Sequence, residues 1–237
     1  MIKDYVTILQ SKEHLIGEVW KYVFTLPEGE ALIFEAGQYV ILKIGTNYRQ
    51  YSIMSPTYQK TSFDLVVELF EHGVGSDFLR NIQVGAQAQF KGPAGVFVLR
   101  NSPYNKIFLA TGTGIAPVRS MIMTHLAEKR PGNLYLFFGL KYHGDVYFEH
   151  EFEELARNNP QFQYKICLSQ EQAVEGLGEC FATGRVNISL EKLWEAQPAG
   201  ELEYYVCGSK GAVDSLKDFV IAHGAQQDRV FFERFTL

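Results

Sequence analysis

A glycine-rich turn is the segment whose residue types most directly suggest ligand chemistry. The run Ala110-Thr111-Gly112-Thr113-Gly114-Ile115-Ala116-Pro117 follows an apolar stretch and opens a segment of helical spacing. Glycine lets the backbone approach a ligand closely, and the free N–H groups at a helix N-terminus suit a pyrophosphate. The run is neither GxGxxG, because Pro117 stands at the last glycine position, nor a Walker loop. By itself it leaves a dinucleotide site and an ordinary tight turn equally open.

Two further predicted strands also end in glycine. Phe138-Gly139 ends one of them, and Cys207-Gly208 ends a later one. In an open α/β sheet, ligands bind outside the carboxyl ends of the strands. Helix packing would explain any one of these glycines. Three glycines at one sheet edge favour a nucleotide that crosses it.

The segment Arg49-Gln50-Tyr51-Ser52 carries a second kind of chemistry. Side chains alternate along a strand, so Arg49 and Tyr51 share one face while Gln50 and Ser52 share the other. An arginine can clamp a phosphate while the neighbouring aromatic ring stacks on a planar ligand. The alternative is a surface Arg–Tyr pair, which this segment taken alone favours.

Another glycine-rich turn, Gly73-Val74-Gly75-Ser76, opens a short predicted helix. Successive backbone N–H groups in such a turn can form a nest for phosphate oxygens. The alternative is a plain turn with Ser76 as the N-cap of the helix.

The elements that must position these residues differ between the two halves of the chain. Up to about residue 100, short β-rich runs alternate with turn residues, a pattern typical of an antiparallel barrel or sandwich. The predicted strands span residues 5–9, 18–26, 39–44, 49–54, 62–70 and 88–91, with one helix at 76–81.

Beyond a polar linker at residues 100–105, strands alternate with helices. Strands are predicted at 107–111, 133–139, 162–168, 204–207 and 229–232, and helices at 116–129, 148–157 and 211–223. Alternating β and α units predict a parallel sheet with helices on both faces. We therefore predict an antiparallel β-barrel domain over residues 1–101 and an α/β domain over residues 102–237.

Composition narrows the classes of function. The 237 residues carry a net charge of −5 and show no basic cluster, so we expect no nucleic-acid partner. Three cysteines without a CxxC pair predict no metal or iron–sulfur site and fit a reducing cytoplasm. No apolar stretch approaches the length of a membrane span, and no leader pattern is visible. Aromatic residues make up 14% of the chain, which is high.

Six short blocks in one order together resemble the ferredoxin–NADP reductase superfamily. They run from about Gln38 to Phe235, nearly the whole chain, and each is weak alone. The blocks are Arg49-x-Tyr51-Ser52, Gly73-x-Gly75-Ser76, Gly92-Pro93-x-Gly95, Gly112-Thr113-Gly114-Ile115-Ala116-Pro117, Cys207-Gly208 and Glu233-Arg234-Phe235.

The resemblance implies an FAD site in the first domain. Arg49 would bind the FAD pyrophosphate, Tyr51 would stack on one face of the isoalloxazine, and Ser52 would lie near flavin N5. The turn formed by Gly73, Val74, Gly75 and Ser76 would be the FAD phosphate loop.

In the second domain, the resemblance implies a site for a nicotinamide nucleotide. Its loop would comprise Gly112, Thr113, Gly114, Ile115, Ala116 and Pro117, with Thr111, Gly139 and Ser169 also in contact with the nucleotide. Cys207 and Gly208 would lie beside the nicotinamide. Phe235 would cover the other flavin face until nicotinamide displaces it. Its odd spacing from Phe232 places the two residues on opposite faces of the strand. We expect Phe231 and Phe232 to lie in the core. Ser52, Cys207, Glu233 and Phe235 are the predicted catalytic residues.

Two departures from the family pattern concern the choice of nucleotide. Relatives specific for NADP often have Ser-Arg where this chain has Ser169-Gln170, and Glu171 follows. A neutral residue followed by an acid suits a dianionic 2′-phosphate poorly, although Lys141 and Arg185 keep cations nearby. NADH is therefore favoured over NADPH.

The leading prediction is an FAD-containing NAD(P)H reductase that passes single electrons to a separate protein. No Cys-x4-Cys-x2-Cys run is present, so the acceptor is expected to be a separate ferredoxin-like, oxygenase or haem component. A reductase of free flavin and an electron-transfer subunit of a larger complex remain as alternatives. The intact turn at Gly73–Ser76 favours held FAD over free flavin.

Overall fold

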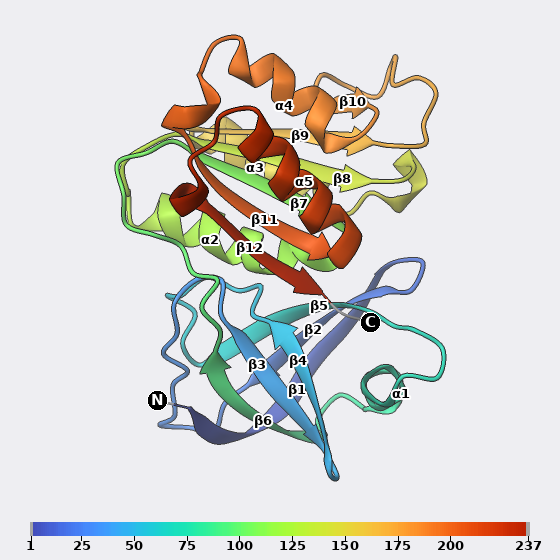
Figure 1. The fold of residues 1–237 in the computed structure, drawn as a ribbon. Helices are drawn as coiled ribbons and strands as arrows, with labels where there is room; N and C mark the ends of the chain where they lie inside the picture. Colours follow the sequence, from blue (N-terminus) through green and yellow to red (C-terminus); the bar gives the residue numbers. More distant parts are fainter. Residues whose placement is uncertain (1, 236–237) are drawn as a thin grey trace. The chain divides into compact units, whose positions relative to one another are not determined.

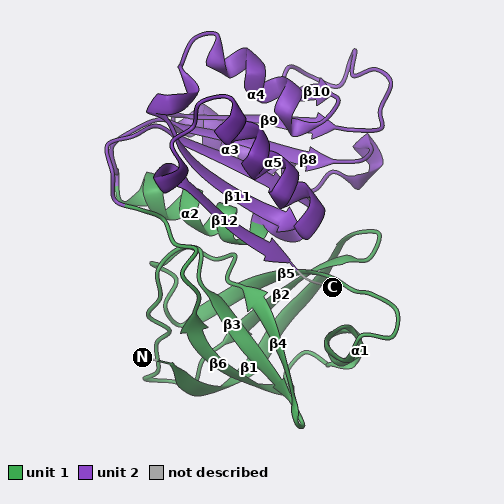
Figure 2. Cartoon of the chain, viewed as in Figure 1, with its two compact units in different colours: residues 1–100, 116–128 green, residues 101–115, 129–237 purple. Residues whose placement is uncertain are grey.

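The structure is a computed structural model that describes residues 2–235. It separates into two compact units, coloured in Figure 2. Residues 1–100 and 116–128 form the first unit, and residues 101–115 and 129–237 form the second. The helix that follows the glycine turn thus groups with the first unit, although we placed it in the second domain. The functional boundary near residue 101 stays a prediction.

The first unit is built on six strands joined by antiparallel pairing in the order β4-β3-β6-β1-β2-β5 (Figure 1). Met54, just past β4, donates its N–H to the carbonyl of Asp64 on β5 at 2.9 Å, which links the two edges. This arrangement confirms the predicted antiparallel fold. The elements are β1 (Lys3–Ile16), β2 (Val19–Thr25), β3 (Tyr39–Ile44), β4 (Asn47–Ser52), β5 (Ser62–Glu68), α1 (Val74–Asn81) and β6 (Gln87–Ala94).

Alternation along the strands drives the aromatic residues of this unit inward. The rings of Phe24, Phe63 and Phe90 come from three strands, and their centroids lie 4.9–5.7 Å apart. All three side chains are buried. Edge-to-face and offset contacts of this kind add stability beyond the area that they bury. Much of the high aromatic content is therefore structural.

The helix α2 (Ile115–Ala127) is held to the first unit by buried polar contacts. The guanidinium of Arg119 donates to the Met54 carbonyl at 3.0 Å, and the Ser120 hydroxyl donates to the Ser55 carbonyl at 2.7 Å. Both acceptors lie within three residues of Ser52. The segment that follows β4 is thus fixed by hydrogen bonds to α2.

The second unit is a parallel sheet of six strands in the order β10-β9-β8-β7-β11-β12. Its elements are β7 (Lys106–Thr111), the 3-10 turn η1 (Gly112–Gly114), β8 (Leu134–Leu140), η2 (His143–Asp145), α3 (Glu149–Asn158), β9 (Phe162–Leu168), β10 (Phe181–Thr183), α4 (Val186–Trp194), η3 (Ala199–Glu201), β11 (Glu203–Ser209), α5 (Lys210–Ala222), η4 (Gln227–Arg229) and β12 (Val230–Phe235).

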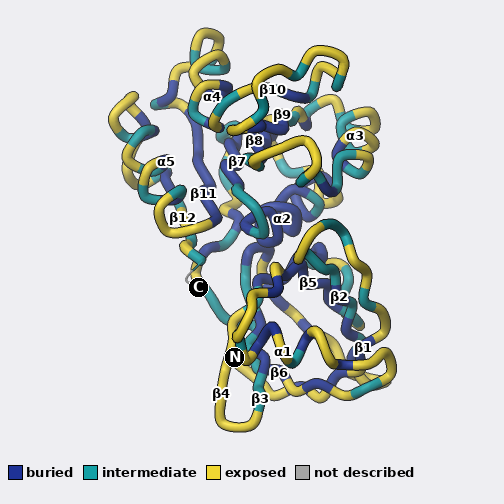
Figure 3. Tube along the Cα trace, turned by 90° about the vertical axis from the view of Figure 1, so that its right-hand side faces the viewer, coloured by how far each residue is buried: buried dark blue, intermediate teal, exposed yellow. Residues whose placement is uncertain are grey.

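Helices cover both faces of this sheet, as predicted. On one face α4 and α5 bury Val186 and Val213 against strand residues such as Leu109 and Val206. On the other face Phe152 of α3 packs against Phe138 of β8, with ring centroids 6.3 Å apart. The central strands are buried along most of their length (Figure 3). Among the described residues, no helix is long and apolar enough to cross a membrane.

The sequence missed β10 and α4. The strand has three residues, too few to show alternation. The helix begins at Val186 and its N-cap, Arg185, makes no side-chain capping bond, while the β-branched Val186 and Ile188 are weak helix formers. Both elements are held by tertiary packing, because Val186 and Leu190 of α4 belong to the sheet core and Phe181 of β10 packs with Ile166 and Leu168 of β9.

Candidate functional site

The side chains of β4 become more buried towards the end of the strand. Arg49 is exposed, Tyr51 is half-buried against the aromatic core, and Ser52 is buried. Arg49 donates to the neighbouring Tyr48 carbonyl at 2.8 Å, so its guanidinium lies along the exposed part of the strand. The face of β4 therefore offers a cation and an aromatic ring next to each other.

The structure brings Gly75, far along the chain, onto this same face. A Cβ at Gly75 would collide with the Tyr51 hydroxyl and would lie 3.2 Å from Cγ of Arg49. Two of the predicted blocks therefore meet in space through the glycine. An FAD pyrophosphate needs a cation and backbone N–H groups close together, and the absence of a Cβ at Gly75 lets this turn pack directly against the Tyr51 hydroxyl and the Arg49 side chain. The residues present fit FAD.

The turn before α1 differs in detail from the expected helix start. The N-cap is Gly73, and α1 begins at Val74 instead of residue 76. Ser76 lies inside the first turn, and its hydroxyl accepts the N–H of Phe70 at 2.9 Å. The expectation that Ser76 is the N-cap is therefore wrong, and its hydroxyl instead holds the loop that precedes the helix.

Burial raises the pKa of the Tyr51 phenol to about 12, an effect that the nearby Arg49 guanidinium partly offsets. The phenol stays neutral across the physiological range. A neutral ring beside a cation suits a site for a planar anionic ligand.

We expect this pKa shift to appear in the pH dependence of stability. Between about pH 10 and 12 the unfolded tyrosine loses its proton while the folded one keeps it, so the free energy of unfolding falls as pH rises. The Tyr51→Phe variant has no phenol to titrate, so it lacks this contribution to the fall in the free energy of unfolding. Urea unfolding of both proteins at pH 8, 10 and 11 should show a smaller alkaline loss in the variant. An identical loss in both proteins would contradict the assignment.

In the second unit, the predicted glycines gather at one sheet edge. Thr111 pairs with Gly139 in the β7–β8 ladder, and Cys207 pairs with Ala110 in the β11–β7 ladder. The carboxyl ends of three neighbouring strands are thus side by side. This is the edge at which α/β sheets bind ligands.

Close backbone contacts explain why two of these positions are glycine. A Cβ at Gly114 would lie 2.6 Å from the carbonyl carbon of Cys207 and 2.7 Å from Cα of Gly208. Gly208 has φ +151°, and a Cβ there would collide with the Thr111 hydroxyl. Gly112 has φ +51°, which favours glycine, and no atom lies within 4 Å of its Cβ position. The backbone therefore packs too closely for a side chain at Gly114 and Gly208, whereas the turn is open at Gly112.

The Cys207 thiol is buried at this edge, and burial raises its pKa well above the usual value, with the Glu233 carboxylate adding to the effect. The thiol is therefore protonated at neutral pH and is a poor nucleophile. Glu233 is its partner in the β11–β12 ladder. The structure thus brings together Cys207 and Glu233, two of the predicted catalytic residues. The protonated Cys207 thiol is suited to packing against a ring more than to covalent chemistry.

Ser169 lies at the end of β9, where its hydroxyl donates to the Leu140 carbonyl at 3.1 Å. The Glu171 carboxylate accepts the His143 N–H at 2.9 Å, which fixes an acid at the loop that follows β8. Lys141 and Arg185 are both exposed. This corner of the edge therefore combines one anchored anion with two solvated cations.

The strand β12 extends to Phe235, beyond the predicted end at residue 232. Phe235 is half-buried, pairs with Ser209 of β11, and lies on the opposite face from Phe232, as expected. The expectation that Phe232 lies in the core is wrong. Its ring is exposed, because β12 is an edge strand, and the Arg234 guanidinium lies over it at 4.6 Å.

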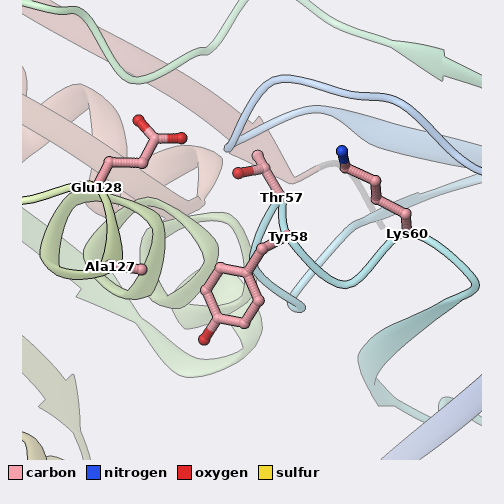
Figure 4. A pocket seen from close by; sticks show the side chains of 5 residues that line it. All are labelled: Thr57, Tyr58, Lys60, Ala127 and Glu128. Atoms are coloured by element: carbon pink, nitrogen blue, oxygen red, sulfur yellow. The ribbon is translucent and has the colours of Figure 1, made fainter.

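A hollow of about 420 Å³ lies elsewhere in the first unit (Figure 4). Its lining residues come from the loop after β4 and from the end of α2: Thr57, Tyr58, Lys60, Ala127 and Glu128. The Thr57 N–H donates to the Thr124 hydroxyl at 3.1 Å. None of the lining residues is a predicted site residue.

Sequence reasoning missed the residues that hold the site residues in place. Arg119 and Ser120 reach the segment after Ser52 from a helix that is distant in sequence, and Asp214 of α5 pairs with Arg234 of β12. Each of these pairs spans 20 or more positions. No local pattern signals such a contact.

Two family models match the chain. The oxidoreductase FAD-binding domain matches residues 7–99, and the oxidoreductase NAD-binding domain matches residues 108–218. Together they cover most of the sequence. The chain thus carries domains for FAD and for a nicotinamide nucleotide, as the sequence predicted.

Curated relatives point to one group of reductases. Ferredoxin–NADP reductase B of Sorangium cellulosum is 38% identical over 62% of this chain and 62% of its own length. Ferredoxin–NADP reductase of Spirulina sp. is 28% identical over 94% of this chain and 88% of its own length. The reductase component DmpP of phenol 2-monooxygenase from Pseudomonas sp. is 29% identical over 85% of this chain and 58% of its own length.

Among solved structures, the Amycolatopsis cytochrome P450 reductase GcoB superposes with a TM-score of 0.87 at 24% identity. The match covers 100% of this chain and 71% of that chain. This likeness confirms the fold class predicted from the sequence.

Proposed function

Because the chain belongs to the ferredoxin–NADP reductase superfamily, we propose that it is an FAD-dependent NAD(P)H reductase that delivers electrons singly to a separate protein. The observation that carries this proposal is the meeting of Arg49, Tyr51 and Gly75 on the face of β4. The acceptor that we propose is ferredoxin-like or an oxygenase component. The names of the Sorangium and Pseudomonas relatives support those two classes.

In the first unit we assign binding and orientation to specific groups. The Arg49 guanidinium and the N–H groups around Gly75 would hold the pyrophosphate, the Tyr51 ring would support one face of the flavin, and the Ser52 hydroxyl would lie near its reactive edge. Bound FAD supplies the exchange between two-electron and one-electron chemistry. The protein contributes position and exclusion of water.

In the second unit the glycine edge would receive the nicotinamide nucleotide. The turn at Gly112–Gly114, which is open at Gly112, would accept the pyrophosphate, while Cys207 and Gly208 would leave room for the nicotinamide ring. Phe235 would occupy the ring position until the nucleotide arrives. The protonated Cys207 thiol would take no covalent part.

The purified protein tests this function. We expect a yellow protein with one FAD per chain, bleached by NADH or NADPH without air and reoxidised by ferricyanide or a ferredoxin. A colourless protein that does not bind added FAD would overturn the proposal. Flavin that dissociates on gel filtration and turns over in excess would instead support a free-flavin reductase, and a flavoprotein without turnover would support a subunit of a complex.

We propose further that NADH is the preferred nucleotide. Gln170 offers no charge to a 2′-phosphate, and Glu171 is held by the His143 N–H at the same corner. An anchored carboxylate repels a dianionic phosphate. The exposed Lys141 and Arg185 are hydrated cations that compensate weakly.

The substitution Gln170→Arg tests this preference. It should raise kcat/KM for NADPH about tenfold or more and leave kcat/KM for NADH nearly unchanged, because a charge-assisted hydrogen bond to phosphate contributes about 1.5–3 kcal/mol. Gln163→Arg, the same change at the other end of β9, is the control and should leave the ratio unaltered. A wild-type preference for NADPH would refute this part of the proposal.

A further inference from the structure

The last strand of the described chain sends neighbouring side chains to opposite faces of the sheet. Val230 packs into the core shared with Val213, Leu216 and Val220 of α5, so the face of Val230 is the α5 face. Alternation places Phe232 and Arg234 on that face, and Glu233 and Phe235 on the other. Arg234 and Phe235 are therefore adjacent in the backbone but point apart.

On the α5 face, an ion pair with Asp214 and a contact with the Phe232 ring hold the Arg234 side chain. Its Nε and Nη2 atoms both lie 2.6 Å from Oδ1 of Asp214, which belongs to α5. Its guanidinium lies 4.6 Å from the ring centroid of Phe232, and the ammonium of Lys217 lies 5.5 Å from that ring. A charge-assisted hydrogen bond and a cation–π contact thus converge on one side chain.

We propose that this ion pair, the Asp214–Arg234 clamp, positions Phe235 at the glycine edge and sets how easily a nicotinamide ring replaces it. The inference rests on the proposed function, in which Phe235 gives way to the nucleotide. The clamp fixes the residue directly before Phe235, and the Ser209–Phe235 pair with β11 follows at once. Asp214 and Arg234 are positioning residues, because they act through Phe235.

Releasing the clamp has a defined consequence. The end of β12 frays more often, so the ring of Phe235 competes less well for its position. The nucleotide then binds more tightly and leaves more slowly. A loss of fold would have the opposite signature, since binding would weaken.

The variant Asp214→Asn tests the clamp, because it removes the charge and keeps the shape of the side chain. Its control is Glu153→Gln, which breaks the exposed pair with Arg157 on α3, at 2.9 Å in the same unit. We expect Asp214→Asn to lower the KM for NADH and the Kd for NAD⁺ by about two- to fivefold, the scale of an exposed ion pair. Its kcat should not rise. Amide hydrogen exchange at whichever of residues 234 and 235 donates its N–H to β11 should be faster by a similar factor, and the control should change none of these quantities.

A double variant separates positioning from general structure. In a Phe235→Ala background, Asp214→Asn should leave KM unchanged, because the residue that the clamp positions is gone. Unchanged exchange at residues 234 and 235, or faster exchange with unchanged KM, would overturn the clamp. A wild-type protein whose flavin is reduced by neither NADH nor NADPH would overturn the proposed function instead. The exchange measurement would still decide whether the ion pair holds the end of β12.

Discussion

Gly75→Ala is expected to lower the affinity for FAD by about one hundredfold while the protein stays folded. The added Cβ collides with the Tyr51 hydroxyl and lies 3.2 Å from Cγ of Arg49. Because these atoms belong to side chains of the site, they can move away, and the fold survives at the expense of the site geometry. The loss combines a misplaced guanidinium with a misplaced stacking ring.

Titration of the apoprotein with FAD, followed by flavin fluorescence, measures the effect, and a thermal melt by circular dichroism checks the fold. Gly144→Ala is the matched control, since no atom lies within 4 Å of its Cβ position and its backbone is unstrained. It should bind FAD as the wild type does. Wild-type affinity in Gly75→Ala would mean that the face of β4 is not the flavin site.

Gly114→Ala should damage the nucleotide edge and the stability of the second unit together. The new Cβ would lie 2.6–2.7 Å from backbone atoms of Cys207 and Gly208, and backbone in a packed sheet cannot rotate away as a side chain does. Overpacking of this kind costs about 1–3 kcal/mol. We expect unfolding at lower urea and a KM for NADH raised at least tenfold.

The bound FAD provides the internal reference for this variant. Its binding residues lie in the first unit, so the FAD content should stay near one per chain while reduction by NADH slows. The same Gly144→Ala control should retain both the urea midpoint and the KM. If Gly114→Ala reduced its flavin at the wild-type rate, the glycine edge would not be the nucleotide site.

Local patterns predicted most elements because their residues follow the alternation or helical spacing of the final fold. The predicted strands at 39–44 and 162–168 match β3 and β9 to the residue. The strand β12 was predicted too short, because the charged Glu233 and Arg234 end the apolar run of residues 230–232. The short β10 and the uncapped α4 depend on tertiary packing and left no local signal.

The residues of the candidate site likewise fall into those that local patterns predicted and those that depend on tertiary contacts. Glycine positions were visible because close approach and positive φ restrict the residue type, as at Gly112 and Gly208. The groups that hold the site were invisible. Arg119 was one charged residue in a helical pattern, and nothing in its neighbours revealed the Met54 carbonyl that it binds. Contacts of this kind are set by the fold and cannot be read from spacing.

Anaerobic stopped-flow mixing of the purified protein with NADH and, in parallel, NADPH tests most directly whether the chain is an FAD-dependent NAD(P)H reductase. We expect rapid bleaching of a flavin that is bound at one per chain, with NADH the faster reductant. A bound flavin that neither nucleotide reduces, or a folded protein that holds no FAD, would contradict it.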